Sequence, residues 1–413
     1  MEIIKYLRKS VPNVIKYNLK YIYKRIQLRF YKRWDAEKIN IYQVKKVNKV
    51  ISTFNFCHDK NYNQINDINE IEHIDITSKH NYSNENAFKK SRGIGLYCSN
   101  TGGTTGKPLK LIKSRNDLAF EAAFIDDIIH DFDVNTFIPY KAVRLRGDNI
   151  DSWIKSTGYN KYSLSSYKIN ENTVKYYYDF LKSFSPDVIF CYPSSLYLLS
   201  KEIISKTDDF DKIKCKVIVF SSENLFDYQL ELIKRVFDSN VINLYGNTEH
   251  SVLAVDYCQG SGFIFNSLYS HVSFKNKKII STSFNDLNMP MLRYDTDDLV
   301  DVDNLGRLKI LGRNQDIAIG VSGQNYPVVG LFFGQHFTFF NEVKEMQLVQ
   351  NKAGQLSIHY YSEKILSESS MLQAQEKVRK LSNNDLDVSF EYKSSPLCRT
   401  KSGKLKFFVK DIL

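Results

Sequence analysis

Residues 99–109 read SNTGGTTGKPL, a stretch with three glycines, three threonines, one serine and one lysine. Glycine admits a left-handed backbone and lets peptide N–H groups approach an anion closely, while the hydroxyls and the lysine add donors and charge. The flanking segments GIGLYC (93–98) and LKLIK (109–113) have strand character. We therefore predict a phosphate-binding loop between two strands, with a plain Gly/Thr-rich hairpin turn as the alternative.

This loop departs from the common P-loop pattern G-x-x-x-x-G-K-[ST]. Gly106 and Lys107 match its end, but Thr101 occupies the position of the first glycine. Pro108 occupies the position of the hydroxyl residue that binds Mg²⁺ in that motif. The sequence therefore disfavours an ordinary P-loop ATPase or kinase.

The composition is that of a globular protein without a membrane-spanning helix. The chain has 413 residues, 43% of them hydrophobic, which allows two or three domains. It contains no stretch of about 18 apolar residues. Its six cysteines are scattered and form no C-x-x-C pair, which favours reduced thiols and a cytoplasmic location.

The net charge of +11 lies entirely in the N-terminal segment. Residues 1–50 contain 14 Lys or Arg and 3 Asp or Glu, so the remainder of the chain is neutral. A nucleic-acid-binding protein more often carries basic charge across its folded surface, and we expect no nucleic-acid partner.

Within this segment, apolar residues recur at helical spacing, with basic residues beside them. The stripe consists of Ile15, Leu19, Ile22, Ile26 and Phe30. One interpretation is a helix that packs on the protein body and leaves a solvated basic rim. The other is peripheral contact of residues 1–34 with an anionic membrane face, which would place the protein at the inner membrane surface.

Five further stretches follow the loop in chain order. They are VIVFSSENLFDYQLELIKRVF (217–237), VINLYGNTEH (241–250), RYDTDD with LGRNQD (293–298 and 311–316), and CRTKSGKLK (398–406). Together with SNTGGTTGKPL they resemble the motifs of the adenylate-forming superfamily of acyl- and aryl-CoA ligases. The resemblance is strongest to the phenylacetate–CoA ligase type and, within it, to the CapK-like capsular polysaccharide proteins.

The resemblance implies a role for each matched position. Tyr245 would stack on adenine, Asp298 and Arg313 would bind the ribose, Thr248 would donate to the α-phosphate, and Glu249 would hold Mg²⁺. Lys404 would be the mobile catalytic lysine, so the implied catalytic residues are Lys404, Glu249 and Thr248. Asp316 would be the hinge before a small C-terminal domain. The full set implied to bind the nucleotide is Ser99, Thr101, Gly102, Gly103, Thr104, Thr105, Gly106, Lys107, Ser222, Glu223, Tyr245, Gly246, Asp298 and Arg313.

The chain departs from the family pattern at several positions. Asp297 replaces the glycine of R-Y-x-T-G-D, and Cys398 replaces the proline before the terminal Arg-Thr. The lysine often found after the hinge is missing from IAIGVSGQNYPV (317–328).

The alternation of short β-branched runs with helical patterns predicts an α/β fold. We expect a large N-terminal domain of several subdomains over residues 1–312, with helix-covered sheets. A small, mobile α+β lid domain is expected over residues 313–413. By position in the family, the acid would be lined by Arg146, Tyr192, Pro193, Ser194 and Leu244.

The implied function is ATP-dependent activation of a carboxylic acid as an acyl-adenylate. Acyl transfer to coenzyme A, an amine or a hydroxyl would follow, in surface polysaccharide biosynthesis, and the acceptor could be a sugar or a lipid-linked glycan. The implied cofactors are ATP and Mg²⁺, with coenzyme A as a further candidate. Two alternatives remain open: a non-catalytic adenylate-binding scaffold, and an adenylyltransferase that leaves AMP on the acceptor.

Overall fold

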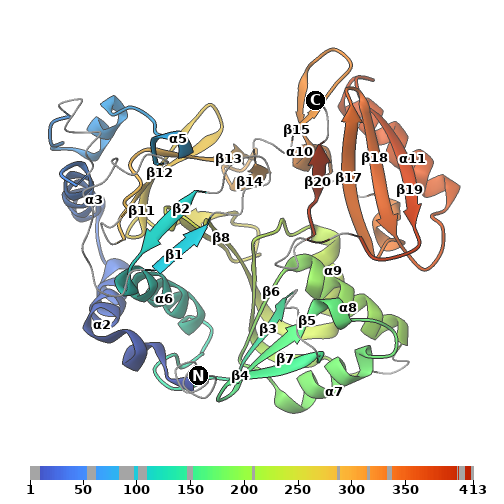
Figure 1. Ribbon diagram of the computed structural model, residues 1–413, viewed down its shortest axis with the longest axis horizontal. Coiled ribbons are helices and arrows are strands. Elements are labelled where there is room, and N and C mark those ends of the chain that lie inside the picture. Colours follow the sequence, from blue (N-terminus) through green and yellow to red (C-terminus); the bar gives the residue numbers. More distant parts are fainter. Residues whose placement is uncertain are drawn as a thin grey trace. The chain divides into compact units, whose positions relative to one another are not determined.

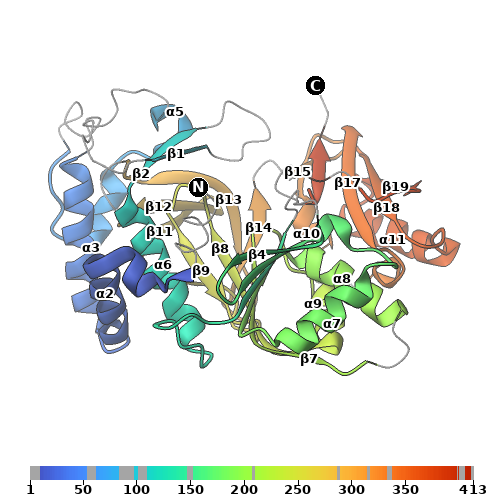
Figure 2. The same ribbon diagram turned by 60° about the horizontal axis from the view of Figure 1, so that its bottom comes forward.

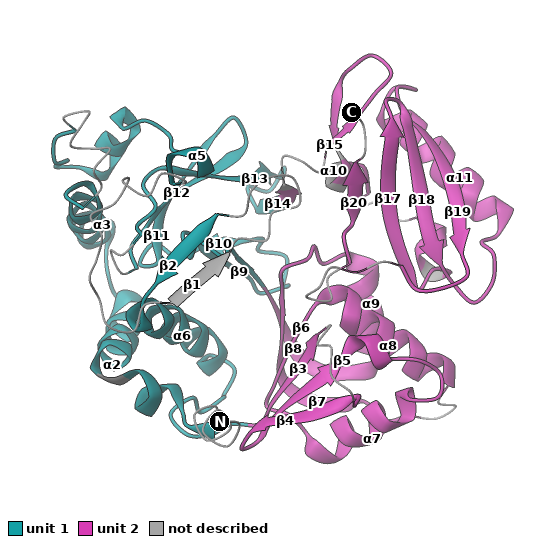
Figure 3. Cartoon of the chain, viewed as in Figure 1, with its two compact units in different colours: residues 1–140, 244–310 teal, residues 141–243, 311–413 magenta. Residues whose placement is uncertain are grey.

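The computed structural model describes residues 10–53, 62–82, 97–100, 109–146, 152–206, 210–285, 289–313, 317–332, 337–397, 399 and 405–410. The chain forms two compact units, and each is assembled from two separate segments (Figure 3). Unit 1 comprises residues 1–140 and 244–310, and unit 2 comprises residues 141–243 and 311–413.

Three helices supply the N-terminal part of unit 1: α2 (Asn13–Tyr31), α3 (Ala36–Ile51) and α6 (Arg115–His130). Helix α6 begins with a capping box, in which the Ser114 hydroxyl accepts from the backbone of Asp117 and the Asp117 carboxylate accepts from the backbone of Ser114. Helix α2 lies alongside α6 (Figures 1 and 2). Its packed face carries Tyr17, Tyr21 and Leu28, all buried.

The strands of unit 1 form antiparallel arrangements. Strands β1 (Tyr97–Asn100) and β2 (Lys110–Lys113) form a hairpin whose register pairs Asn100 with Lys110. A second sheet has the order β11-β12-β13-β14. Its strands are β11 (Ser270–Lys275), β12 (Lys278–Ser283), β13 (Tyr294–Val302) and β14 (Leu308–Arg313), whose last three residues belong to unit 2. Strand β9 (Leu253–Asp256) pairs antiparallel with β10 (Ile264–Phe265).

One buried arginine ties residues 62–82 to this sheet. This segment contains the 3₁₀ helix η1 (Ile68–His73) and the short helix α5 (Lys79–Tyr82). The Arg293 guanidinium, which is 2% exposed, donates to the carbonyl oxygens of Ile71 at 3.0 Å and Ile74 at 2.6 Å. It also pairs with the Glu72 carboxylate at 2.5 Å. Arg293 therefore supplies hydrogen-bond donors to several backbone carbonyl oxygens of this segment.

Unit 2 contains a mixed sheet whose order is β8-β7-β6-β3-β5-β4. Strands β3, β5, β6 and β7 run parallel, and β4 pairs antiparallel with β5. The strands are β3 (Ala142–Arg146), β4 (Ile154–Gly158), β5 (Lys161–Ser165), β6 (Val188–Cys191), β7 (Ile213–Ser221) and β8 (Phe237–Gly246), the last of which crosses into unit 1. The apolar runs of β6 and β7 are buried, as strands in the middle of a covered parallel sheet require.

Three helices lie together on one side of this sheet (Figures 1 and 2): α7 (Val174–Phe184), α8 (Pro193–Lys206) and α9 (Asp227–Val236). A short 3₁₀ helix, η3 (Ser166–Lys168), precedes α7.

The C-terminal part of unit 2 is a smaller α+β body. Its sheet has the order β19-β18-β17-β20, and helix α11 (Glu368–Leu381) packs against β19. The strands are β17 (Glu345–Lys352), β18 (Gln355–Tyr361), β19 (Asp387–Lys393) and β20 (Phe408–Lys410), preceded by β15 (Ile317–Ile319), β16 (Asn325–Pro327), α10 (Val328–Phe332) and η4 (Thr338–Asn341).

The predicted α/β class is confirmed, with a helix-covered mixed sheet and a separate smaller sheet. The predicted strand, turn and helix over 217–237 are β7, a turn and α9. The domain boundary at 312/313 and the mobility of the C-terminal domain stay predictions. No helix among the described residues is both long enough and apolar enough to cross a membrane.

Helix α2 packs on unit 1, as one of the two interpretations predicts, but most of the apolar stripe is outside the packed face, and only Ile22 of the stripe packs on the core. Of that stripe, Ile15, Leu19, Ile26 and Phe30 are exposed. Helix α2 instead packs through the opposite face, where tyrosines and the stems of Lys24 and Arg25 are buried. Such amphipathic side chains bury an apolar stem and keep a polar end. The positions of purely apolar residues in the sequence therefore did not identify the packed face.

We predict that Arg293→Met lowers the free energy of unfolding of unit 1 by at least about 3 kcal/mol, because several carbonyl oxygens lose their donor. Urea unfolding in a Trp153→Phe background follows unit 1 through Trp34 fluorescence. The control is Lys277→Met, which removes an exposed ion pair with Asp301 and costs less than about 1 kcal/mol. An equal cost for both variants would contradict the role given to Arg293.

Candidate functional site

Two motifs of the sequence meet in unit 1 through a partly buried hydrogen bond. Tyr245, near the end of β8, donates its hydroxyl to Asp298 Oδ2 on β13 at 2.7 Å. Burial and the adjacent carboxylate raise the pKa of the Tyr245 phenol well above its ordinary value, so the phenol stays protonated and remains a donor. The Tyr245 ring also meets Phe263 and Phe265 edge-on, at centroid separations of 6.3 and 6.2 Å. These contacts fix the tyrosine ring beside the Asp298 carboxylate.

The residue that departs from the family pattern fits its position. Asp297 has φ of 63°, in the left-handed region that favours glycine. Aspartate is among the residues that tolerate this conformation, because its short polar side chain and neighbours can hydrogen-bond locally. Here the Asp297 backbone N–H donates to Asp295 Oδ1 at 2.9 Å. Asp297 therefore adopts a backbone conformation that glycine would also adopt, and a local hydrogen bond supports it next to Asp298.

The same two motifs meet a second time at Glu249. The buried Tyr294 donates its hydroxyl to Glu249 Oε1 at 3.1 Å. Burial and this carboxylate raise the pKa of Tyr294, so it too stays a donor. Burial lowers the pKa of Lys113, which is 8% exposed, while the nearby carboxylates of Glu121, Asp117 and Glu249 act in the opposite direction. The next residue, His250, has a pKa lowered by burial and is therefore neutral near pH 7.

The residues around Glu249 are compatible with one magnesium ion. Among the described residues, no group of three or more His, Cys, Asp or Glu could hold a metal by itself. Mg²⁺ in nucleotide sites is usually bound by one or two carboxylates, with substrate phosphates and water completing its coordination. A single carboxylate beside a neutral histidine fits that pattern. Thr248 and Gly246, also predicted here, are exposed.

In unit 2 the carboxyl ends of three parallel strands bring together most of the residues expected to line the acid. The register aligns the ends of β3, β6 and β7, because Cys191 lies between Leu145 and Phe220. Ligands of open α/β sheets bind at such strand ends. Arg146 ends β3, and its guanidinium lies 5.8 Å from the ring centroid of the buried Tyr192. The predicted Leu244 belongs to unit 1 and is half-buried on β8.

Glu223 connects this edge to the end of the chain. It follows Ser222, which has φ of 70°, in the turn after β7. Its carboxylate accepts the backbone N–H of Ser194 at 3.1 Å and that of Leu405 at 3.0 Å. Burial raises the pKa of Glu223, while these N–H groups and the nearby Arg399 favour its charged form. Glu223 thus links Pro193–Ser194, at the start of α8, to the segment just after Lys404.

A buried ion pair fixes the other end of that segment. Arg399 pairs with Glu345, and the two side chains are 6% and 2% exposed. Arg399 also lies 3.4 Å from the Ser194 hydroxyl and forms an antiparallel bridge with Leu405. The stretch that contains Lys404 therefore begins and ends beside the start of α8. Sequence reasoning did not assign Arg399, although it stands in CRTKSGKLK, and no motif marks Glu345.

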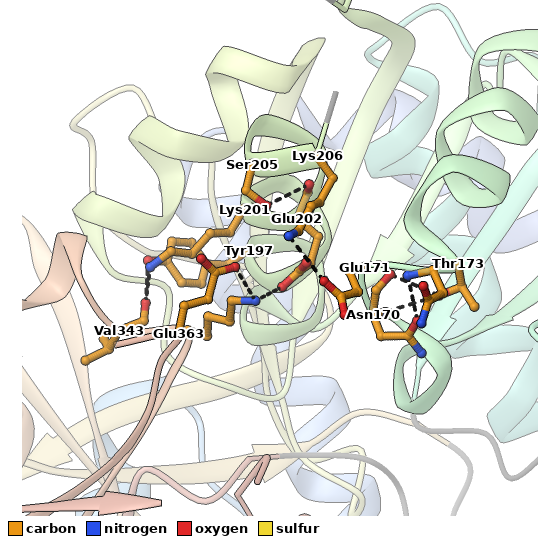
Figure 4. A network of polar contacts seen from close by, with 12 residues as sticks. Asn170, Glu171, Thr173, Tyr197, Lys201, Glu202, Ser205, Lys206, Val343 and Glu363 are labelled. Carbon is orange, nitrogen blue, oxygen red and sulfur yellow. Dashed lines mark hydrogen bonds and ion pairs between the residues drawn. The ribbon is translucent and has the colours of Figure 1, made fainter. Parts of the chain in front are cut away.

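A network of charges attaches the smaller body of unit 2 to helix α8 (Figure 4). Lys344 pairs with the buried Glu202 and lies 3.0 Å from Glu363. Lys201 donates to the Val343 carbonyl, and the Tyr197 hydroxyl lies 3.3 Å from the same oxygen. The network orients β17, and therefore Glu345, relative to α8.

Several predicted residues lie outside this description. Thr101–Lys107, Asp316 and Lys404 fall outside the described residues. The backbone of Ser99 lies on β1, and the backbone of Arg313 lies on β14. Strand β2 matches the predicted strand 109–113, whereas only residues 97 and 98 of the predicted strand 93–98 are described, and both lie on β1.

The comparisons with known proteins agree with the motifs at the level of the fold. The chain superimposes on 2-hydroxyisobutyryl-CoA ligase in the postadenylation state in complex with R3-HIB-AMP, with a TM-score of 0.56, 13% identity, and coverage of 98% of this chain and 91% of that chain. For the anthranilate CoA ligase AuaEII in complex with anthranoyl-AMP, the TM-score is 0.54 at 12% identity, with coverage of 75% and 65%. The chain therefore has the fold of adenylate-forming CoA ligases, and the predicted resemblance is confirmed.

In sequence, the chain is 22% identical over 375 residues to Protein CapK of Staphylococcus aureus, covering 84% of this chain and 80% of that protein. No protein-family profile matches it.

We predict a specific pH dependence from the α8 network. Burial, with the Lys344 ammonium nearby, lowers the pKa of Lys201 from 10.5 to about 8. Between these values the folded chain binds fewer protons than the unfolded chain, so the free energy of unfolding rises with pH. The stability that Lys201 gains from being deprotonated at high pH is lost as the pH falls from 10.5 to about 8. The Lys201→Met variant lacks this part of the pH dependence.

The measurement is urea unfolding from pH 7.5 to about 10.5, followed by Trp153 fluorescence in a Trp34→Phe background. Lys182→Met, which removes a lysine from the surface of the same unit, serves as the reference variant. Parallel stability curves for wild type and Lys201→Met would show that Lys201 is not desolvated as described.

Proposed function

We propose that the protein activates a carboxylic acid with ATP as an acyl-adenylate and then transfers the acyl group to coenzyme A, an amine or a hydroxyl. The observation that carries this proposal is the pair of contacts Tyr245–Asp298 and Tyr294–Glu249. Each contact joins the Y-G-N-T-E motif to the R-Y-D-T-D-D motif, and each presents a carboxylate. The fold shared with acyl-adenylate-bound CoA ligases supports the same conclusion.

In the first step, a carboxylate oxygen of the acid attacks the α-phosphorus of ATP, and pyrophosphate leaves with the electrons of the broken P–O bond. In the second step, the acceptor attacks the acyl carbon, and AMP leaves. Both reactants of the first step are anions, so the site has to supply cations and hydrogen-bond donors. We assign Lys404 to bridge the two reactants and the 101–107 loop to hold the β- and γ-phosphates.

We assign the nucleoside to the Tyr245–Asp298 pair. A carboxylate can accept hydrogen bonds from both ribose hydroxyls while one of its oxygens also accepts the Tyr245 hydroxyl. The Tyr245 ring, held by its phenylalanine neighbours, then offers an aromatic surface for adenine. Glu249 is assigned to Mg²⁺, which neutralises phosphate charge when it is bound.

The similarity to Protein CapK supports a role in surface polysaccharide synthesis, with a sugar or lipid-linked glycan as the final acceptor. We place the chain near the phenylacetate–CoA ligase type and in the cytoplasm. Of the two alternatives, the non-catalytic scaffold gains no support from Asp297, because this aspartate adopts the left-handed conformation that glycine also favours. An adenylyltransferase would yield a stable AMP-linked product in place of free AMP.

We predict that Lys404→Ala slows acid-dependent pyrophosphate exchange by about 10²–10³-fold, while ATP binding is retained. The assay is run over a panel of amino, hydroxy, uronic and aryl acids. Lys406→Ala is the matched control, since it removes a lysine two positions away. Unchanged exchange in Lys404→Ala, measured with an acid that wild type activates, would contradict the assigned role.

We predict that Asp298→Asn weakens ATP binding at least about ten-fold, because charge-assisted hydrogen bonds to the ribose are lost. Tyr245→Phe keeps the ring and loses only the hydroxyl, so its effect on calorimetrically measured affinity is smaller. Asp301→Asn, in an exposed ion pair on the same strand, is the control. The ribose assignment fails if Asp298→Asn and Asp301→Asn bind ATP equally well.

A further inference from the structure

Helix α2 presents a row of large apolar side chains to solvent. We call this row the outer stripe; its members and their exposed fractions are Ile15 (69%), Leu19 (79%), Tyr23 (68%), Ile26 (51%) and Phe30 (53%). At about 100° per residue, all five fall within an arc of about 80° on the helix surface. Single exposed apolar residues are ordinary, but five on one face form a continuous patch that marks an interaction surface.

The opposite face of α2 is held firmly on unit 1. The buried Tyr21 hydroxyl donates to Asp126 at 2.6 Å, and Arg25 donates to the Thr136 hydroxyl at 2.8 Å. Lys24 lies above the Phe120 ring at 4.8 Å and donates to Tyr42 at 3.1 Å. Because turning the helix would break all of these contacts, the outer stripe is fixed in its outward orientation.

Basic side chains border the stripe on both sides. By helical angle, Lys16 and Lys20 lie next to one edge of the stripe, and Arg29 lies next to the other. Lys20 and Arg29 are exposed. The sequence contains no Asp or Glu between positions 3 and 34. The surface is therefore apolar along its centre and positively charged at its edges.

We propose that the outer stripe docks the protein on an anionic lipid surface, with α2 lying in the plane of the membrane interface. Apolar side chains enter the boundary between headgroups and acyl chains, while flanking cations contact anionic headgroups. A second copy of the chain suits the surface less well. Two stripes packed face to face would bring the two basic borders together, and like charges at an interface repel.

The proposal is independent of the proposed function, because adenylation and lipid binding are measured separately. The full-length protein is mixed with vesicles of phosphatidylglycerol and phosphatidylcholine, or of phosphatidylcholine alone, and the bound fraction is determined by co-sedimentation. We expect binding to the mixed vesicles only, weakening as salt is added.

Substitutions on the outer stripe and on its basic borders then separate the apolar contribution to vesicle binding from the electrostatic one. The double variant Leu19→Glu/Ile26→Glu should lose at least about ten-fold in vesicle binding, since apolar burial is lost and negative charge is added. Lys20→Gln and Arg29→Gln should each cost roughly five-fold. Both stripe positions are exposed, so thermal unfolding should be unchanged. Leu305→Glu, at a site 75% exposed on the same unit, is the matched control and should bind like wild type.

Two results would overturn the proposal. One is vesicle binding in Leu19→Glu/Ile26→Glu that equals that of Leu305→Glu. The other is sedimentation of the lipid-free protein as a dimer that this double substitution dissociates, because the stripe would then be an interface between copies. If the full-length protein binds vesicles but shows no acid-dependent pyrophosphate exchange, that result counts against the proposed function and not against lipid binding.

Discussion

The hydrogen bond from Tyr245 to Asp298 joins two segments that are separated by 53 positions in the chain. It requires β8 to deliver an aromatic ring and β13 to deliver a carboxylate to the same point of unit 1. Burial and the Asp298 carboxylate raise the pKa of the Tyr245 phenol, so the phenol stays protonated and donates to that carboxylate. The neighbouring Tyr294–Glu249 bond repeats this arrangement between the same two motifs. The proposed nucleotide chemistry depends on these two phenol–carboxylate pairs.

In unit 2, buried carboxylates hold the C-terminal segment in position. Glu223 accepts from the backbone N–H groups of Ser194 and Leu405, and Glu345 accepts from a backbone N–H group and from Arg399. Together the two glutamates position both ends of the segment that carries Lys404. A buried carboxylate left without such donors would be costly, so these contacts depend on one another. If the C-terminal body moves between the two half-reactions, as we expect from the family resemblance, Glu223 has to exchange the Leu405 N–H for another donor or for water.

The sequence predicted best the features that depend on short-range patterns. Strand β7 could be located because buried strands are runs of apolar and β-branched residues. The proximity of Tyr245 and Asp298 followed from the motif resemblance, and no periodicity could have supplied it. The ion pair between Arg399 and Glu345 was missed because a contact across 54 positions leaves no trace in a single sequence.

The packed face of α2 was also mispredicted, for a physical reason. That face buries tyrosines, Lys24 and Arg25, whose polar ends find partners on α6 and in the segment that follows it, while ordinary apolar residues remain outside. Apolar periodicity identifies an amphipathic helix, but it does not show which face meets the protein.

A crystal structure with a non-hydrolysable acyl-adenylate mimic tests the central claim most directly. The account predicts both ribose hydroxyls within hydrogen-bonding distance of the Asp298 carboxylate, and the adenine ring against Tyr245. A mimic bound elsewhere, with Asp298 in contact with Tyr245 but not with the ligand, would contradict it.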